Sequence, residues 1–289
     1  MSWAVAVGKD AGRAGRQALR ALRGAGEEGR LLANRSRDHL TESVAEAADA
    51  GDPILVVGGD GTLNLVVDAL LAVERAQPPT IGVVSAGTGS DFARMFAVPS
   101  DVEAAVEKAV HGEDYPTDAM ELSGDWGIRR GINVFEAGLG ASTVGWADRL
   151  PRWIGPIKYE VAFWLALPTF RPGSFVLEVE GRTFEGGGLV VVAANGEFFG
   201  GGMRIAPKAS LVDGAFDMIV VDAPKREAFS LFPRMKQGLH LTHPGVRRVT
   251  TPWFRLTTEP GWPSEVDGEF LGSTPVEGRI LPGALSMRI

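Results

Sequence analysis

The chain has 289 residues, of which 45% are hydrophobic and 22% charged, with a net charge of −7 and no cysteine. This length predicts two domains or one large α/β unit, and the composition is typical of a soluble globular protein. The acidic balance argues against a nucleic-acid binder and against general attraction to an anionic membrane, and the lack of cysteine excludes disulfides, thiolate metal sites and a cysteine nucleophile.

The N-terminal segment and the longest apolar run indicate where in the cell the protein is expected. Residues 1–7 are typical of a short strand and lack the basic start and cleavage site of a signal peptide. The longest apolar run, residues 161–167, is too short to span a bilayer. We therefore expect a cytoplasmic protein.

Strands and helices alternate over the first part of the chain. Apolar runs predict strands at residues 3–7, 30–33, 54–57 and 81–84. Helical periodicity predicts helices at residues 12–23, 40–50, 62–75 and 102–110, with a further helix near Asp91. Within residues 62–75, one helical face carries Leu63, Val66, Val67, Leu70 and Val73. This order predicts a three-layer α/β domain with a mainly parallel sheet over residues 1–118.

The pattern changes after about Tyr115. Glycine turns separate runs that are typical of strands, at residues 175–180, 189–194, 216–221 and 254–257, and helices are expected at 157–167 and 225–239. We expect a largely antiparallel β-sandwich domain over residues 119–281. A last strand near residues 284–289 is expected to return to the first domain, which would then include residues 282–289.

A glycine-rich turn follows the strand at residues 54–57. It consists of Gly58, Gly59, Asp60, Gly61 and Thr62, and a helix follows. Such a turn lets backbone N–H groups approach phosphate oxygens at the carboxyl end of a strand, and the helix N-terminus adds partial positive charge. Asp60 makes sense there if it holds Mg²⁺. The alternative is a tight turn in which Asp60 or Thr62 caps the helix.

A second glycine turn, residues 85–94, repeats this logic after the strand at residues 81–84. It contains Gly87, Thr88, Asp91 and Arg94. Neither the dinucleotide fingerprint G-x-G-x-x-G nor the P-loop G-x-x-x-x-G-K-[ST] is present. Asp91 and Arg94 either form a structural pair or hold the phosphate end of a ligand.

Five motifs in order make a specific resemblance. In their spacing they resemble the diacylglycerol kinase catalytic-domain family, which includes bacterial lipid kinases and sphingoid-base kinases. The resemblance covers nearly the whole chain and rests on residues 58–64, 87–94, 195–209, 213–217 and 266–269. It implies phosphoryl transfer from ATP to the hydroxyl of diacylglycerol or a related lipid.

The resemblance also implies roles for particular residues. Glu269 matches the family's proposed general base, and Asp60 its phosphate- and Mg²⁺-binding aspartate. Asp118 is implied in the charged network around that metal. Nucleotide contacts are implied at Gly58, Gly59, Gly61, Thr62, Gly87 and Thr88. From the residues alone, Asp267-Gly268 is also a hairpin turn that leaves Glu269 as a solvated strand residue.

A second, structural Mg²⁺ site is implied at Asp213. The family completes it with the backbone carbonyls of the residues that correspond to Ser210 and Ala215. The alternative is a plain Asp-Gly turn between strands.

The chain departs from the family pattern near its start. The family's first strand usually ends in Asn-Pro, where this chain has Lys9 within residues 8–12. Lys9 is expected to contact phosphate in place of the asparagine's hydrogen bonds. Further departures at Ser36, Leu65, Ser85 and Ser90 leave the nucleotide preference open.

Two segments combine aromatic and basic residues. They are residues 146–164 and 225–241. Such segments seat a helix at lipid headgroups, or they form core with snorkelling cations. The expected partners are ATP and a lipid at a membrane surface, with no nucleic acid. The oligomeric state stays open, a homodimer included.

Two rival functions stay open. An NAD kinase shares the residue 58–62 turn, but it fits residues 87–94 and 267–269 poorly. A regulator that binds nucleotide or lipid without turnover is favoured only by the altered residues 8–12. The four histidines, His39, His111, His240 and His243, are expected at the surface.

Overall fold

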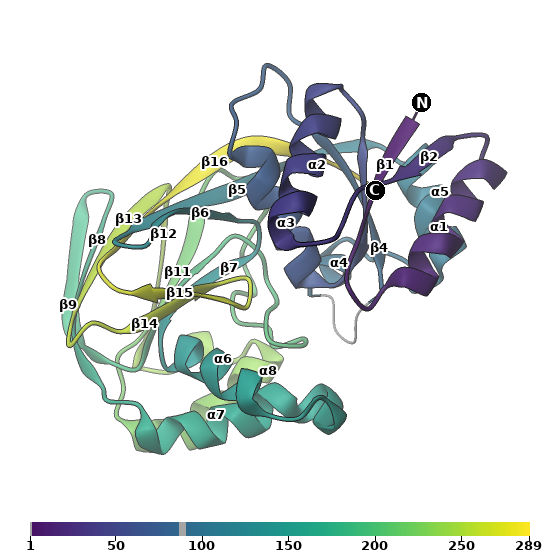
Figure 1. Cartoon of the computed structure of the whole chain (residues 1–289). Helices are drawn as coiled ribbons and strands as arrows, with labels where there is room; N and C mark the ends of the chain where they lie inside the picture. The colour runs from purple at the N-terminus through teal and green to yellow at the C-terminus, as the bar shows by residue number, and fades with distance from the viewer. Residues whose placement is uncertain (1, 87–90) are drawn as a thin grey trace. The chain divides into compact units, whose positions relative to one another are not determined.

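The computed structural model describes residues 2–86 and 91–289 (Figure 1). They form two compact units. Unit 1 comprises Met1–Ala119 with Pro282–Ile289, and unit 2 comprises Met120–Leu281. Two strands run across the division in the chain, β5 (Asp114–Gly124) and β16 (Val276–Arg288).

Unit 1 contains a parallel sheet. Its strands are β1 (Ser2–Val7), β2 (Glu28–Leu31), β3 (Ile54–Gly58) and β4 (Thr80–Ser85), in the order β2-β1-β3-β4. The end of β16 adds a further parallel strand, with Ser286 opposite Thr80 on β4. The end of this strand therefore belongs to the first unit.

Helices cover both faces of this sheet (Figure 1). α1 (Gly12–Gly24) and α5 (Val102–His111) pack with Trp3, Val5 and Leu55 in one buried cluster. α2 (Arg37–Asp49) and α3 (Asp60–Leu71) pack against each other and against β3. The three-layer α/β architecture predicted for this region is confirmed, because strands buried on both faces require helices on both sides.

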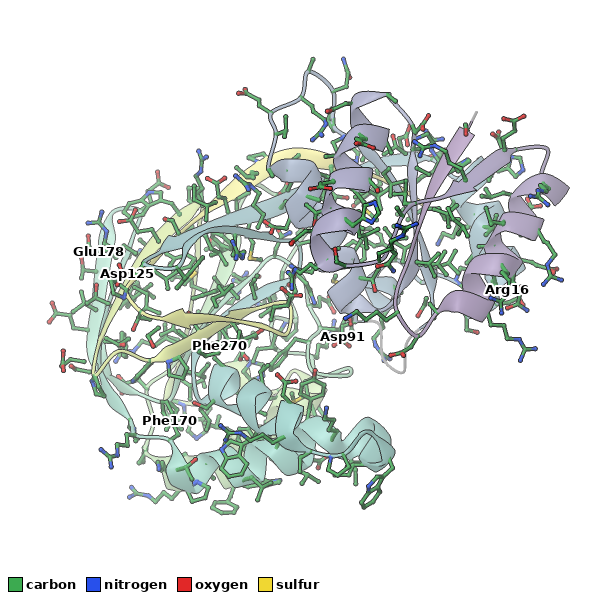
Figure 2. The ribbon with its side chains drawn as sticks, in the orientation of Figure 1. Arg16, Asp91, Asp125, Phe170, Glu178 and Phe270 are labelled. Atoms are coloured by element: carbon green, nitrogen blue, oxygen red, sulfur yellow. The ribbon has the colours of Figure 1, made fainter. Side chains whose placement is uncertain are left out.

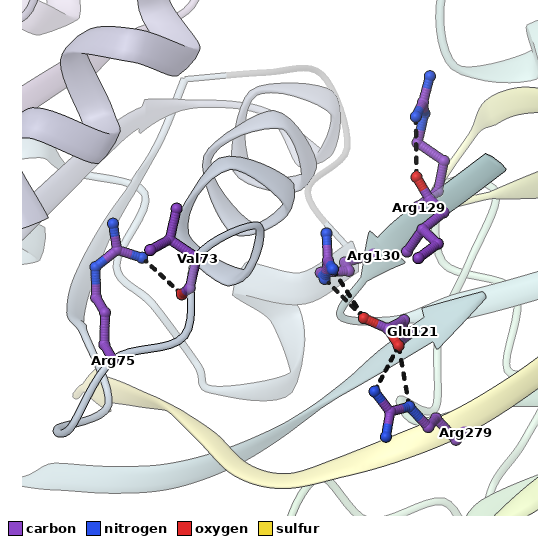
Figure 3. Close-up of polar contacts among 7 residues, drawn as sticks. Val73, Arg75, Glu121, Arg129, Arg130 and Arg279 are labelled. Atoms are coloured by element: carbon purple, nitrogen blue, oxygen red, sulfur yellow. Dashed lines mark hydrogen bonds and ion pairs between the residues drawn. The ribbon is translucent and has the colours of Figure 1, made fainter. Parts of the chain in front are cut away.

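Two element boundaries differ from expectation. β2 lies at Glu28–Leu31, earlier than the predicted residues 30–33. α3 begins at Asp60 and ends at Leu71, so Val73 is 48% exposed and not on a buried helical face. The cause is Arg75, whose guanidinium donates to the carbonyl of Leu70 and to Asp49 of α2. It also donates to the carbonyl of Val73 (Figure 3). Arg75 thereby satisfies the carbonyls that end the helix.

Unit 2 contains an antiparallel six-stranded sheet in the order β12-β11-β10-β7-β14-β15. The strands are β7 (Val134–Gly138), β10 (Val190–Ala194), β11 (Phe216–Val221), β12 (Val246–Thr251), β14 (Pro263–Val266) and β15 (Glu269–Ser273). The facing layer contains β8 (Gly173–Val179), β9 (Arg182–Gly188), β13 (Trp253–Glu259), β6 (Gly127–Gly131) and the unit 2 parts of β5 and β16.

Aromatic side chains fill the space between these two layers. The Phe254 ring of β13 lies 5.4 Å from the rings of Phe135 on β7 and Phe216 on β11. Strand β13 alternates buried and exposed residues along its length. This alternation is typical of a sheet with one buried face, and the predicted β-sandwich is confirmed.

Three helices complete unit 2: α6 (Leu139–Arg149), α7 (Lys158–Thr169) and α8 (Ala228–Gln237). α7 and α8 pack through stacked rings, with Phe163 4.3 Å from Phe232 and Trp164 5.0 Å from Phe229. α6 was not predicted, because its glycines, serine and threonine have weak helix propensity. Its buried Leu139 and Val144 show that packing decides its structure.

Glu121 joins three strands of unit 2 through ion pairs (Figure 3). Its carboxylate lies 2.8 Å from Arg130 of β6 and 2.7 Å from Arg279 of β16. Burial alone would raise the pKa of Glu121, but the hydrogen bonds and charges of these arginines outweigh it and leave the pKa below its usual value.

Candidate functional site

The ends of β1 and β3 in unit 1 meet where the strand order changes direction. The chain passes from β1 outward to β2 and then returns to β3 on the other side of β1. In open α/β sheets, ligands bind outside the carboxyl ends of the strands at such a point. The residues of the predicted turn, 58–62, lie there: Gly58 ends β3, Gly59 follows, and residues 60–62 form the first turn of α3.

Thr62 explains two of the glycines at this edge. A Cβ atom on Gly8, after β1, would lie 2.6 Å from Thr62 Oγ1, and a Cβ atom on Gly58 would lie at the same distance. The Thr62 side chain therefore occupies the space above both strand ends. The Gly8 N–H donates to the Val57 carbonyl at 2.9 Å, which ties the two strand ends together.

Gly61 has no comparable explanation within the chain. A Cβ atom placed on it would meet nothing within 4 Å in the part of the chain that the structure describes. Gly61 lies in the first turn of α3, where glycine costs about 1 kcal/mol of helix stability relative to alanine. A glycine that packing does not require suits a backbone that a ligand approaches closely.

Asp60 connects the first glycine turn to the second motif. Its carboxylate accepts the N–H of Asp91 at 3.0 Å and the N–H of Phe92 at 3.3 Å. These groups begin α4 (Asp91–Met95), and Asp91 is labelled in Figure 2. Asp60 therefore caps α4, a role that the sequence did not indicate.

The other residues predicted to bind nucleotide belong to the second glycine turn and to the segment after β1. Gly87 and Thr88 lie outside the described residues. Lys9 lies exposed in the turn after β1. Arg94 Nε lies 3.9 Å from Asp91 Oδ1, so the structural pairing of these two residues is present.

Asp118 is buried near the end of unit 1. Its Oδ1 accepts the N–H of Gly283 at 2.8 Å, and Gly283 has a φ of +55°. This bond fixes β5 to the returning β16. The described contact is therefore one that stabilises the fold, whereas the predicted place of Asp118 in a metal network stays a prediction.

Glu269 begins β15 directly after the turn that joins it to β14. Asp267 has a φ of +50° and Gly268 a φ of +84°, the positive values that a type I′ hairpin turn requires. Glu269 is half-buried, and its neighbour Phe270, labelled in Figure 2, is exposed. A hairpin turn at residues 267–268 is therefore compatible with Glu269 as a candidate base, because the turn holds the glutamate at a defined position.

Asp267 fixes this turn to the start of β7. Its carboxylate accepts three backbone N–H groups, from Ile132 at 2.8 Å, Asn133 at 3.1 Å and Val134 at 2.8 Å. Asn195 donates to the carbonyl of Ile132 at 2.7 Å. Asp267, two residues before Glu269, and Asn195 therefore both bind the backbone of residues 132–134.

A buried pair of carboxyl groups lies beside the same turn, and sequence reasoning missed it. Glu136 on β7 lies directly opposite Glu265 on β14, and they are only 3% and 2% exposed. Burial raises the pKa of Glu136 to about 8, and burial together with the Glu136 charge raises the pKa of Glu265 well above its usual value. The pair therefore holds at least one proton at neutral pH.

This pair predicts that stability falls as pH rises from 7 to 8. The Glu136 carboxyl ionises at about 4.5 in the unfolded chain and about 8 in the folded one. Its contribution is complete below the unfolded value and is lost as pH rises through the folded value, by up to about 1.4 kcal/mol per pH unit. Denaturant unfolding at pH 7.0, 7.5 and 8.0 should show this slope, and Glu136→Gln should reduce it. An equal slope in both proteins would contradict the assignment.

Asp213 lies in an exposed turn. Its Oδ1 accepts the N–H of Ala215 at 3.2 Å, which forms an Asx turn. Burial raises the pKa of the nearby Asp217, and the Asp213 charge adds to this, whereas the ion pair with Arg248 opposes it. No group of three or more His, Cys, Asp or Glu side chains gathers as a metal site among the described residues.

The expectation that all four histidines lie at the surface was wrong for His240. This side chain is fully buried, and its Nε2 lies 2.8 Å from the Ile205 carbonyl. Burial lowers the pKa of His240, which favours the neutral ring. The bond to the Ile205 carbonyl, 35 residues away in the chain, could not be read from the sequence.

Two family models together match most of the chain. The model of the diacylglycerol kinase catalytic domain matches residues 5–122. The model of the YegS C-terminal NAD kinase beta sandwich-like domain matches residues 133–289.

Curated relatives and solved structures agree with these matches. A probable lipid kinase YegS-like protein of Cronobacter sakazakii is 29% identical over 248 residues, covering 85% of this chain and 81% of the relative. A Bacillus subtilis diacylglycerol kinase is 28% identical over 265 residues, covering 90% and 86%. A crystal structure of a putative diacylglycerol kinase from Bacillus anthracis str. Sterne has a TM-score of 0.82 at 22% identity, covering 99% and 94%, and shows the same fold.

Proposed function

Because the chain belongs to the diacylglycerol kinase family of lipid kinases, we propose that it transfers a phosphoryl group from ATP to a hydroxyl of diacylglycerol or a related lipid. The proposal assigns nucleotide binding to unit 1, and lipid binding and proton removal to unit 2. The observation that supports it most is Gly61, whose lack of a side chain nothing described in the chain requires.

The nucleotide phosphates bind at the N-terminus of α3 in this proposal. The backbone at Gly59 and Gly61 approaches the phosphate oxygens, and the partial positive charge of the helix end adds to the attraction. The side chain of Thr62 lies at the same edge, between Gly8 and Gly58. Gly87, Thr88 and Lys9 are assigned further phosphate contacts on the resemblance.

Glu269 acts as the general base. As the lipid hydroxyl oxygen attacks the γ-phosphorus, its proton passes to the Glu269 carboxylate. The bond between the γ-phosphorus and the bridging oxygen breaks, and ADP leaves with that oxygen. The 267–269 turn suits this role, because Asp267 fixes it through three backbone hydrogen bonds.

Asp60 fits a Mg²⁺ site, because its carboxylate lies in the first turn of α3, beside the proposed phosphate site. Mg²⁺ is usually held by one or two carboxylates together with substrate phosphates, and it would neutralise the charge that develops on them. We also assign Asp118 to the charged groups around this Mg²⁺. A second, structural Mg²⁺ is assigned to Asp213 and the backbone carbonyls of Ser210 and Ala215, because all three donors are oxygen atoms.

The test is a phosphorylation assay over a panel of acceptors. Purified protein is incubated with Mg²⁺ and either ATP or GTP, and the acceptors are diacylglycerol, sphingoid bases, other lipid alcohols and NAD. We expect phosphate incorporation into a lipid. Incorporation into NAD would favour the NAD kinase alternative, and nucleotide binding without turnover on any acceptor would favour a regulator.

A lipid substrate requires access to a membrane, and unit 2 exposes large apolar side chains on and around α7 and α8. No helix in the described part of the chain is long and apolar enough to cross a bilayer. We call the exposed side chains on and around α7 and α8 the helical face; they are Trp153, Ile157, Tyr159, Leu165, Phe229 and Leu239. Trp153 is 85% exposed and Phe229 67%, and the Arg226 side chain beside α8 is 82% exposed.

We propose that the helical face docks on an anionic membrane, with aromatic rings at headgroup depth. Changing Trp153 and Phe229 together to alanine should weaken binding to phosphatidylglycerol-containing vesicles about tenfold or more. Vesicle sedimentation measures this, and the matched control is Trp253→Ala, which removes an exposed tryptophan of β13. Equal vesicle binding by the double variant and the wild type would contradict the assignment.

A further inference from the structure

The buried pair of Glu136 and Glu265 touches the turn that carries Glu269. Glu265 Oε2 accepts the N–H of Gly268 at 2.7 Å. Gly268 is the residue directly before Glu269, and its φ of +84° is one that glycine adopts without strain. The hydrogen bond therefore joins a fully buried side chain to the backbone of the candidate base.

The packing around the pair leaves its side chains little freedom. A Cβ atom on Gly140, in the first turn of α6, would lie 2.1 Å from Glu136 Oε2. The carboxyl thus occupies the place where any other residue at position 140 would have a side chain. Glu136 and Glu265 lie directly opposite each other on paired strands. Glu136 therefore packs beside Glu265, and Glu265 accepts the N–H of Gly268.

We propose that Glu265, supported by Glu136, is a positioning residue for Glu269. The buried glutamate pair holds the 267–269 turn from inside the sheet, while Asp267 holds it from the side of residues 132–134. The proposal rests on the proposed role of Glu269 as base and adds the residues that orient it.

Protonation of the pair links this positioning to pH. Each glutamate faces the other, and Asp267 is the further charge that acts on Glu265. The residues opposite the pair on neighbouring strands are Val192 of β10 and Phe270 of β15. The elements that contact β7 and β14 are β10, β15 and α6. Their ionisable residues are Glu269 at the start of β15, and Asp148 and Arg149 at the far end of α6.

Ionisation of the pair places negative charge in this buried site, close to the Asp267 carboxylate. The Gly268 hydrogen bond favours the ionised form of Glu265, but burial and repulsion from the Glu136 carboxylate outweigh it. The turn is therefore held best while the pair is protonated.

The first experiment compares Glu265→Gln with Glu265→Leu. Glutamine keeps an oxygen that accepts the Gly268 N–H, whereas leucine of similar size does not. We expect Glu265→Gln to retain most of kcat and Glu265→Leu to lose it on the order of 10- to 100-fold, with an unchanged KM for ATP. Equal kcat in wild type and a folded Glu265→Leu would overturn the proposal, and so would equal losses in the two variants.

The second experiment does not require Glu265→Leu to fold. In the wild type we expect kcat to fall as pH rises through about 8, the pKa of Glu136. Glu136→Gln, which cannot ionise, should lose this alkaline decline. An identical alkaline decline in the two proteins would overturn the link between the pair and the turn.

Amide hydrogen exchange at Gly268 separates this inference from the proposed function. In one outcome, the protein phosphorylates no acceptor, yet Glu265→Leu or Glu136→Leu speeds amide exchange at Gly268. The positioning then stands, and the assignment of the base fails. If Glu269→Gln abolishes turnover but Gly268 exchange is the same in every folded Glu265 and Glu136 variant, then the base stands and the positioning fails.

Discussion

Glu269→Gln is expected to lower kcat for lipid phosphorylation by about 10²- to 10⁴-fold, the usual contribution of a general base. Glutamine has nearly the same shape but cannot take the proton of the lipid hydroxyl. The hairpin should keep its form, because its anchors are Asp267 and the Gly268 N–H rather than the Glu269 side chain. KM for ATP should change little, since the nucleotide motifs belong to unit 1. Steady-state kinetics at saturating lipid measures both constants.

The matched control is Glu185→Gln, which removes a negative charge from an exposed position of β9. It should leave kcat unchanged. Full turnover by Glu269→Gln would show that another group removes the proton, or that none is needed for a largely dissociative transfer.

Asp60→Asn is the second change with a large expected effect. It removes the negative charge that the proposal assigns to Mg²⁺, and we expect at least a 10²-fold loss of turnover. The single carbonyl oxygen of asparagine can accept only part of the hydrogen bonding that the N–H groups of Asp91 and Phe92 now donate to Asp60. We therefore also expect a loss of about 1 kcal/mol in unfolding free energy, similar to the loss of a helix cap.

Kinetics at varied Mg²⁺ and denaturant unfolding separate these two effects. The control is Asp38→Asn, which changes an exposed acidic residue in the first turn of α2. Stability loss without loss of turnover in Asp60→Asn would mean that Asp60 only caps α4, and the nucleotide site would need another metal ligand.

Much of the fold follows from apolar periodicity. The buried runs at residues 54–57 and 81–84 predicted parallel strands, because strands covered on both faces are apolar throughout. α6 was missed because its weak helix formers gain their structure from packing against β7 and β14. The early end of α3 was missed because Arg75, a good helix former, turns back onto the helix instead of extending it.

Part of the candidate site could also be predicted from the sequence, and part could not. Its motifs could be found because glycine turns after buried strands have a sequence signature. The partners of those motifs could not, because strand pairing sets them. Glu136 and Glu265 lie far apart in the chain, and only the register of β7 with β14 brings them together. The bond from Asp60 to α4 depends equally on the order of the parallel strands.

The most direct test of the central claim follows radiolabelled phosphate from γ-labelled ATP into diacylglycerol dispersed in anionic vesicles. Wild type and Glu269→Gln are assayed side by side with Mg²⁺. The account predicts labelled phospholipid with the wild type and at least a 10²-fold lower rate with the variant. Absence of label in this and every other lipid acceptor, by wild-type protein that is folded and binds ATP, would contradict it.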